Sequence, residues 1–166
     1  MNSRVQTQLC LLRHAHAGDP MKWHDPDDVR PLSDKGRLQA ERLGLFLADA
    51  GFQPDAIISS PMLRALETAR LVATPLEMLV RVDPALAGPL TLAAVEELLS
   101  RAGNPSRPVL VGHDPDFSEL SATLTGAAEL PVRKGAMLRI DIARPIEAGE
   151  GLLRWLLPPE LLLPRD

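Results

Sequence analysis

Short, continuous apolar runs alternate along this chain with longer stretches in which apolar residues recur every three or four positions. A continuous apolar run is typical of a strand buried on both faces of a sheet, and the longer spacing is typical of an amphipathic helix. The expected strands cover residues 9–12, 56–58, 78–82, 109–111, 137–142 and 152–156. The strand–helix alternation between them predicts an α/β protein, a three-layer α/β/α fold with a mainly parallel sheet.

Residues that cap helices occur where this alternation requires them. Ser33 and Thr91 can each accept a hydrogen bond from the free backbone N–H groups that begin a helix. Ser60-Pro61 has the same appearance, with serine as the cap and proline at the first helical position. Residues 15–31 are polar and rich in Gly, Pro and acidic side chains, which predicts a loop. We interpret its acidic run, residues 25–28, as a solvated part of that loop.

Length and charge exclude several classes of protein. The chain of 166 residues, 45% of them apolar, suits one domain over residues 1–166. The formal net charge of −4 argues against a nucleic-acid partner. The leucine-rich end, residues 152–163, is too short to span a membrane and is broken by Pro158-Pro159. It is expected to cover the core or a partner surface, which leaves both a monomer and a homodimer open.

The cysteine content and the first residues indicate a cytoplasmic location. Cys10 is the single cysteine and lies in an apolar run, so an internal disulfide is impossible and a buried thiol is expected. Residues 1–8 are polar and lack the apolar region of a signal peptide.

Basic side chains follow three of the expected strands. The first strand ends in Arg13-His14, and the fourth ends in Gly112-His113. The second strand leads into a helix whose first turn reaches Arg64. Ligands of an open parallel sheet bind beyond the carboxyl ends of its strands, so we expect these side chains at one edge of the sheet.

This combination of residue types suits phosphoryl chemistry. An imidazole titrates near pH 6.5, and its neutral form can attack phosphorus to give a phosphohistidine. A guanidinium pairs with two phosphate oxygens at once. Arg64 is expected near the positive end of its helix dipole, where a bound anion offsets the cost of a cation. The alternative for Arg64 is an ion pair with Glu67 or Glu41 at the surface.

Three ordered segments carry a resemblance to a known family. The segment Leu12-Arg13-His14-Ala15 resembles the signature, usually Arg-His-Gly, of the histidine phosphatase superfamily, whose fold is called phosphoglycerate mutase-like. Residues 59–69 resemble its second arginine segment, and residues 111–115 resemble its second histidine segment. The short chain and residues 30–36 narrow the resemblance to the SixA-like phosphohistidine phosphatases.

The resemblance implies a role for each matching residue. His14 accepts the phosphoryl group, while Arg13, Arg64 and His113 hold its oxygens and stabilise the charge of the transition state. Water then releases phosphate from His14. Arg30 is a further candidate that reaches the substrate from the loop, or else pairs with Asp27 or Asp28. No metal and no cofactor are expected, because the side chains supply the positive charge.

Two departures from the family pattern matter. Ala15 replaces the usual glycine, and a small residue still fits a tight turn. Larger members carry a glutamate after the third strand as general acid, whereas here Asp83 is the nearby acidic candidate. An alkoxide leaving group needs a proton, but the imidazole of phosphohistidine needs less help. We therefore expect a phosphohistidine-bearing protein as the substrate.

Three alternatives stay open at this point. Phosphomonoesters of small molecules are one other substrate class. A non-catalytic phosphate-binding module could use the same pocket. A metal-dependent hydrolase could instead use His14 and His16, with His24 and Asp114 as further ligands, although barrels of that kind need about 250 residues.

Overall fold

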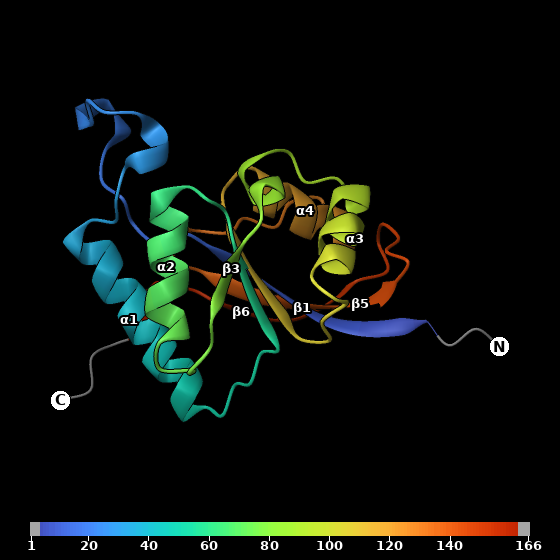
Figure 1. The fold of residues 1–166 in the computed structure, drawn as a ribbon. Coiled ribbons are helices and arrows are strands. Elements are labelled where there is room, and N and C mark those ends of the chain that lie inside the picture. The colour runs from blue at the N-terminus through green and yellow to red at the C-terminus, as the bar shows by residue number, and fades with distance from the viewer. Residues whose placement is uncertain (1–3, 163–166) are drawn as a thin grey trace.

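A computed structural model describes residues 4–162 as a six-stranded sheet with helices on both faces (Figure 1). Residues 1–3 of the polar start and Leu163 of the leucine-rich end lie outside the described part. The strands are β1 (Val5–Arg13), β2 (Ala56–Ser59), β3 (Val80–Val82), β4 (Pro108–Gly112), β5 (Met137–Arg144) and β6 (Leu152–Leu157). The helices are α1 (Asp34–Asp49), α2 (Leu63–Ala73), α3 (Leu92–Arg101) and α4 (Asp116–Thr125).

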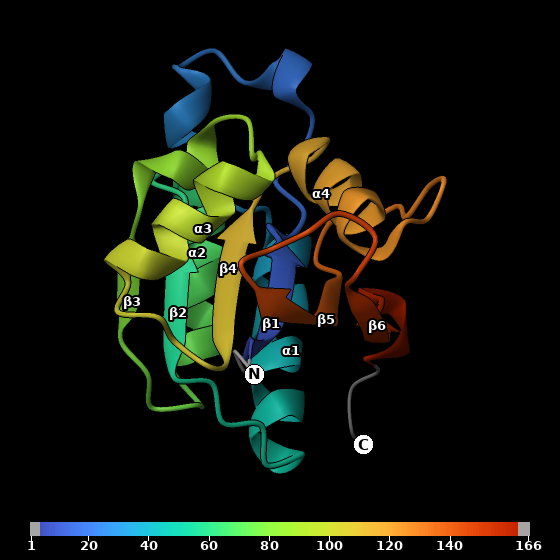
Figure 2. The same ribbon diagram turned by 90° about the vertical axis from the view of Figure 1, so that its right-hand side faces the viewer.

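The sheet is mainly parallel, as the alternation predicts. Its strand order is β3-β2-β4-β1-β5-β6, which the reader can follow from left to right in Figure 2. β1 pairs in parallel with β4, β4 with β2, and β2 with β3. β5 runs antiparallel to both β1 and β6. The carboxyl ends of β1, β2 and β4 therefore meet at one edge of the sheet.

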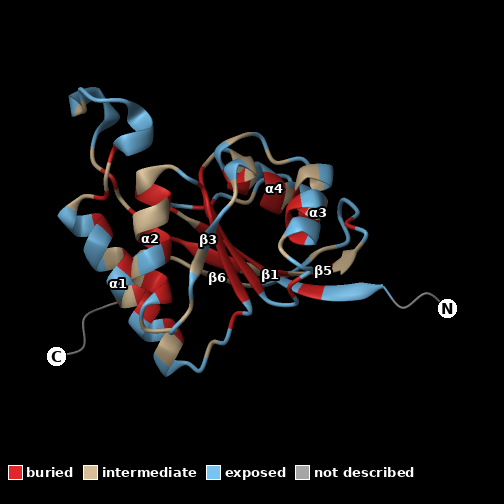
Figure 3. Ribbon diagram, viewed as in Figure 1, coloured by how far each residue is buried: buried red, intermediate tan, exposed pale blue. Residues whose placement is uncertain are grey.

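Two apolar layers bury the two faces of the sheet (Figure 3). α1 and α2 cover one face, where Leu43 and Val72 pack with Leu12 of β1. α3 and α4 cover the other face, where Leu98 and Phe117 pack in the cluster of the opposite core. Because successive strand residues point to opposite faces, the apolar runs of the central strands supply both cores at once. The three-layer α/β/α expectation is confirmed.

Two of the expected caps form. The Ser33 hydroxyl accepts from the N–H of Gly36 at 3.1 Å at the start of α1. The Thr91 hydroxyl accepts from the N–H of Ala94 at 3.0 Å at the start of α3. Each bond satisfies one of the backbone donors that the first helical turn leaves free.

The expected cap at Ser60 is wrong, because α2 begins at Leu63 and is preceded by Met62 without a side-chain cap. The Ser60 hydroxyl instead accepts from the Met62 N–H at 3.2 Å and lies 2.7 Å from Nε2 of His113. The strand bounds also differ from the expected ranges by one to four residues, and β1 and β3 are two examples. β1 begins at Val5, since that residue already pairs with Arg144 of β5. β3 covers only residues 80–82, where it pairs with β2.

The long loop between β1 and α1 rises beyond the carboxyl edge of the sheet (Figures 1 and 2). It contains two short 3-10 turns, η1 (Pro20–Lys22) and η2 (Asp27–Val29). Cys10 is buried within β1, and burial raises the pKa of its thiol to about 12, so the expected inert thiol is found. Within residues 4–162, none of the helices has the length and apolar character to cross a bilayer.

Candidate active site

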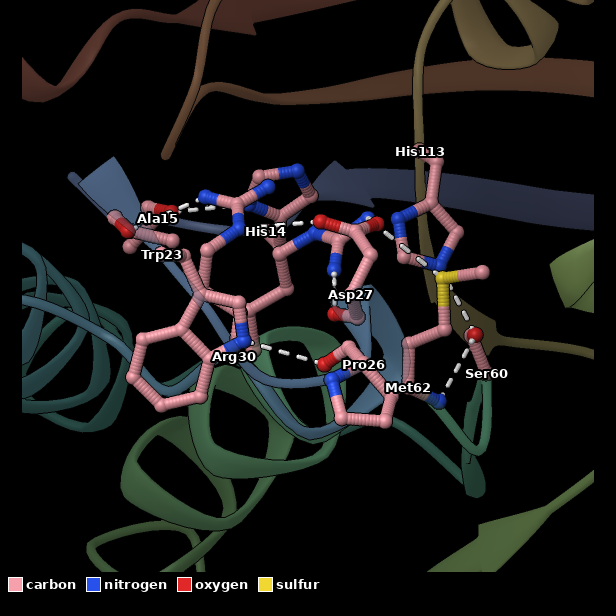
Figure 4. Close-up of polar contacts among 11 residues, drawn as sticks. His14, Ala15, Trp23, Pro26, Asp27, Arg30, Ser60, Met62 and His113 are labelled. Atoms are coloured by element: carbon pink, nitrogen blue, oxygen red, sulfur yellow. Dashed lines mark hydrogen bonds and ion pairs between the residues drawn. The ribbon is translucent and has the colours of Figure 1, made fainter. Parts of the chain in front are cut away.

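Two imidazoles face each other at the carboxyl edge of the sheet. His14 follows β1 and His113 follows β4, and the parallel pairing of Arg13 with Gly112 brings the two residues together. Their ring centroids are 5.4 Å apart with an interplanar angle of 51°. Both side chains are buried, and Figure 4 shows them beside the loop residues Asp27 and Arg30. The convergence that the sequence predicts is thus present.

The His14 ring is held in one orientation and one tautomer. Its Nδ1 lies 2.8 Å from the carbonyl oxygen of Ala15. A carbonyl oxygen only accepts, so Nδ1 carries the proton of the neutral ring and Nε2 keeps a free lone pair. Burial lowers the pKa of His14 to about 3, and the charges of Arg64 and Arg13 act in the same direction. His14 is therefore neutral at pH 7, with the Nε2 lone pair available.

In His113 the engaged ring nitrogen is Nε2, whereas in His14 it is Nδ1. Its Nε2 lies 2.7 Å from the Ser60 hydroxyl, which itself accepts from the Met62 N–H. In the tautomer in which the Ser60 hydroxyl donates to Nε2, the ring proton lies on Nδ1. Burial lowers the pKa of His113 to about 4, aided by Arg64 and Arg13, so the ring is a neutral donor at pH 7.

Arg64 and Arg30 both donate hydrogen bonds to one aspartate of the loop, Asp27. Nη1 of Arg64 donates to the Asp27 carbonyl at 2.9 Å, and Nη2 donates to its carboxylate at 3.0 Å. Nε of Arg30 donates to the other carboxylate oxygen of Asp27 at 3.0 Å, and its Nη1 donates to Ala17. Arg30 thus both pairs with Asp27 and reaches the group around His14. These hydrogen bonds hold the pKa of Asp27 below its ordinary value, so it is ionised at pH 7.

Arg13 enters the same group from the sheet. Its Nη1 donates to the Val132 carbonyl at 2.9 Å and lies 3.4 Å from the Asp114 carboxylate. Asp114 in turn accepts from the Ser118 hydroxyl, which fixes the carboxylate on α4. Asp114 therefore positions Arg13 in this structure.

Three buried donors of the group have no hydrogen-bond partner. Five buried side-chain polar atoms lack one in residues 4–162, and three of these are Nε of Arg13, Nε of Arg64 and Nδ1 of His113. An unsatisfied buried donor costs about 1–3 kcal/mol, so three such atoms around one imidazole need an explanation. A bound oxyanion is the kind of partner that would satisfy such donors. The arrangement can therefore hold a phosphoryl group in front of Nε2 of His14.

Sequence reasoning named Asp27 only as a partner of Arg30, and it did not predict Thr68. Asp27 belongs to the run interpreted as solvated, yet it also pairs with Arg64. Thr68 accepts from the Ala15 N–H at 3.0 Å and donates to the Arg64 carbonyl at 2.7 Å. This hydroxyl ties the turn after His14 to α2.

Trp23 of the loop and Asp83 at the end of β3 have partners outside the group around His14. The Trp23 indole donates to the Pro26 carbonyl at 3.0 Å and so braces the turn that carries Asp27 (Figure 4). Asp83 caps a 3-10 turn by accepting from Ala85, and it forms an ion pair with Arg101. Both carboxylate oxygens of Asp83 are thus engaged by Ala85 and Arg101.

The alternative metal pair, His14 and His16, is not arranged as a metal site. Nδ1 of His16 lies 2.6 Å from the Ser33 hydroxyl, whereas Nδ1 of His14 faces Ala15. Among the described residues, no group of three or more His, Cys, Asp or Glu side chains is placed to hold a metal ion. The donor set around His14 consists of cations and imidazoles, which suits an anion.

Comparisons with known proteins agree with this geometry. Residues 9–88 match the model of the histidine phosphatase superfamily (branch 1). Over 166 aligned residues the chain is 32% identical to an uncharacterized protein of Picosynechococcus sp., and the alignment covers 95% of this chain and 99% of that protein. It is 38% identical over 69 residues to the mitochondrial serine/threonine-protein phosphatase Pgam5 of Drosophila virilis, covering 42% of this chain but only 23% of that protein.

The fold comparison extends the similarity beyond the residues that the family model matches. The structure of the protein histidine phosphatase SixA complexed with tungstate is similar with a TM-score of 0.80 at 22% identity, over 95% of this chain and 100% of that one. This shared fold includes β4 and β5, which lie beyond residue 88. The sequence matches and the shared fold together establish that this chain belongs to the histidine phosphatase superfamily.

Proposed function

We propose that this chain hydrolyses protein phosphohistidine through a phosphoryl group carried on Nε2 of His14. One observation supports this most: a neutral imidazole with a free Nε2 lies among three unpaired donors, those of Arg13, Arg64 and His113. A non-catalytic phosphate-binding module needs the donors but has no use for a nucleophile held in a fixed tautomer. The proposed reaction is a double displacement at phosphorus.

In the first displacement, the Nε2 lone pair of His14 forms a bond to phosphorus while the bond to the leaving group breaks. Negative charge on the equatorial oxygens is stabilised by the guanidinium groups of Arg13 and Arg64 and by Nδ1–H of His113. The freed imidazole of the substrate takes up one proton from solvent. In the second displacement, a water oxygen bonds to phosphorus and the P–N bond to His14 breaks. One proton of this water returns to solvent, which replaces the proton taken up in the first displacement, and inorganic phosphate leaves.

The acidic residues near the site favour phosphohistidine over phosphomonoesters. Asp83 is engaged by Arg101, and Asp27 is an ionised carboxylate between Arg30 and Arg64. Neither is placed to protonate an alkoxide. An imidazole leaving from a labile P–N bond depends less on such an acid. The likeness to Pgam5, whose name states serine/threonine-protein phosphatase activity, favours phosphoserine and phosphothreonine as the second candidate.

A substrate panel tests the proposal. Purified enzyme is assayed on a phosphohistidine protein, on phosphoserine and phosphothreonine peptides and on small phosphomonoesters, beside His14→Asn. We expect kcat/KM to be at least about a hundredfold higher for phosphohistidine, and His14→Asn to be inactive on every substrate. Better turnover of the esters would overturn the substrate assignment. Full activity of His14→Asn would overturn the mechanism.

A further inference from the structure

The turn from Val132 to Ala136 is fastened to the backbone of the nucleophile. The N–H of Gly135 donates to the carbonyl of His14 at 3.0 Å, and the Arg13 N–H donates to Ala136 at 3.1 Å. The Val132 carbonyl accepts from the Arg13 guanidinium. Lys134 lies in the middle of this turn, so the fold places a lysine beside the proposed phosphoryl site.

Lys134 is a half-buried cation without a partner. In the part of the chain that the structure describes, its ammonium forms no hydrogen bond and no ion pair. Burial lowers its pKa first, and the charges of Arg13, Arg30 and Arg64 lower it further. No carboxylate opposes these effects. A cation held among three others without a partner is unfavourable unless an anion binds there.

The positive charge continues away from His14, on the side of α1. Lys35 and Lys134 both lower the pKa of His16, after the larger effect of burial, so both lysines act at the same place. The backbone contacts agree with this position. Gly135, the neighbour of Lys134, donates to the His14 carbonyl and packs against Gln39, whose side chain accepts from the His16 N–H at 3.0 Å.

A groove of ≈ 490 Å³ begins at this point. Its lining residues come from α1 and from the segments around residues 133 and 160, and they are Lys35, Leu38, Gln39, Arg42, Arg133, Pro159, Glu160 and Leu162. Gly135 joins the groove to the site, because a Cβ there would lie 3.3 Å from Gln39 and 3.5 Å from Pro159. Glu160 pairs with Arg133 at 3.2 Å, which leaves the lining with an excess of positive charge.

We propose that Lys134 and Lys35, with the groove beyond them, bind an acidic segment of the protein that carries the phosphoryl group. This deepens the proposed function, since it assumes that the phosphoryl group is bound at His14. The chain as a whole has a net charge of −4, so this cationic strip contrasts with the rest of the surface. Charge complementarity then selects a substrate whose residues flanking the phosphorylated side chain are Glu or Asp.

Binding of matched peptides tests the proposal without requiring turnover. Two phosphohistidine peptides, identical except that the flanking residues are Glu or Gln, are titrated into the full-length His14→Ala variant by fluorescence anisotropy. A phosphoserine pair is titrated in parallel. We expect the Glu peptide to bind roughly five- to tenfold more tightly than the Gln peptide at low salt, with the difference shrinking as KCl is added.

Variants show which residues cause the preference for the Glu peptide. Lys134→Met and Lys35→Met, each combined with His14→Ala, are expected to reduce the preference for Glu to less than about twofold. Lys22→Met removes the same charge from an exposed position in η1 and is expected to keep it. The Kd of inorganic phosphate is expected to stay within about twofold in Lys134→Met, measured with otherwise wild-type enzyme.

Three results would overturn the inference. These are equal binding of the Glu and Gln peptides, a preference that survives in Lys134→Met, and a loss of phosphate affinity in that variant as large as the loss for the Glu peptide. The last result would make Lys134 part of the phosphoryl site itself. Failure of wild-type enzyme to hydrolyse phosphohistidine while it hydrolyses phosphoserine would instead overturn the proposed function, and the peptide comparison would still decide the inference.

Discussion

Asp27 shows how one side chain can change the properties of a binding group. Its carboxylate joins Nε of Arg30 to Nη2 of Arg64, while its own backbone carbonyl holds Nη1 of Arg64. Side chain and main chain therefore anchor Arg64 independently. The carboxylate also adds a negative charge close to the proposed phosphoryl site, where a phosphate dianion would be repelled.

Replacing Asp27 by the isosteric Asn separates these two effects. Asp27→Asn removes the charge and keeps one accepting oxygen, so one of the two side-chain contacts with Arg30 and Arg64 is lost. The backbone anchor of Arg64 is unaffected. We expect the inhibition constant of inorganic phosphate to fall roughly three- to tenfold, because electrostatic repulsion is relieved. Phosphate inhibition measured over a range of substrate concentrations gives this constant. A rise in its value would mean that the charge of Asp27 is needed to orient Arg64.

At the scale of elements, the first turn of α1 packs directly on the chain after His14. The carbonyl of His16 accepts from the Ser33 N–H and from the Ser33 hydroxyl, both at 3.0 Å. A Cβ on Gly36 would lie only 1.9 Å from that carbonyl oxygen. The loop and the helix can approach this closely because residue 36 has no side chain, which in turn fixes the path of the chain leaving β1.

A pair of glycine substitutions tests this contact. Gly36→Ala is expected to lower the free energy of unfolding by at least about 2 kcal/mol, because backbone must move to admit the methyl group. Gly88→Ala is the control, since a Cβ there meets nothing within 4 Å, and its effect is expected to stay within about 0.5 kcal/mol. Urea denaturation of the two variants measures both values. Equal stability of the two would show that α1 shifts freely.

The elements differed in how well their sequence predicted them, for physical reasons. β2 and β4 are buried along their full length, so continuous apolar runs identify them. The first part of β1 is mostly exposed and polar, which hides its pairing with β5. Ser60-Pro61 has the sequence of a helix start, but the hydroxyl of Ser60 bonds to His113, and this contact depends on β2 and β4 being neighbours.

The candidate site divides in the same way. His14, His113 and Arg64 follow strand ends, so a parallel sheet brings them together once the strands are placed. Asp27 depends instead on how the long loop folds back over the edge, and no periodicity encodes that path. Thr68 is likewise found only when the distance from α2 to Ala15 is known.

For the whole molecule, burying two neutral imidazoles makes stability depend on pH. The pKa is lowered to about 3 in His14 and to about 4 in His113, against about 6.5 in an unfolded chain. Between these values the unfolded state binds more protons than the folded state, so stability rises with pH. The stabilisation is fully present above pH 6.5 and is lost as pH falls toward 4.

Chemical denaturation between pH 4 and 7 tests this linkage. We expect the free energy of unfolding to fall with decreasing pH by up to about 1.4 kcal/mol per unit for each histidine, beyond the change caused by the carboxylates. The double variant His14→Gln, His113→Gln keeps those carboxylates and is expected to show a shallower slope. Identical slopes for the two proteins would mean that both imidazoles titrate normally in the folded state.

The most direct test of the account is to find where the phosphoryl group resides during turnover. Enzyme mixed with a ³²P-labelled phosphohistidine protein is quenched within milliseconds in base, and the labelled peptide is identified by mass spectrometry. The account predicts a base-stable, acid-labile label on His14, absent from His14→Asn. Turnover without label on the enzyme, or with label on another residue, would contradict it.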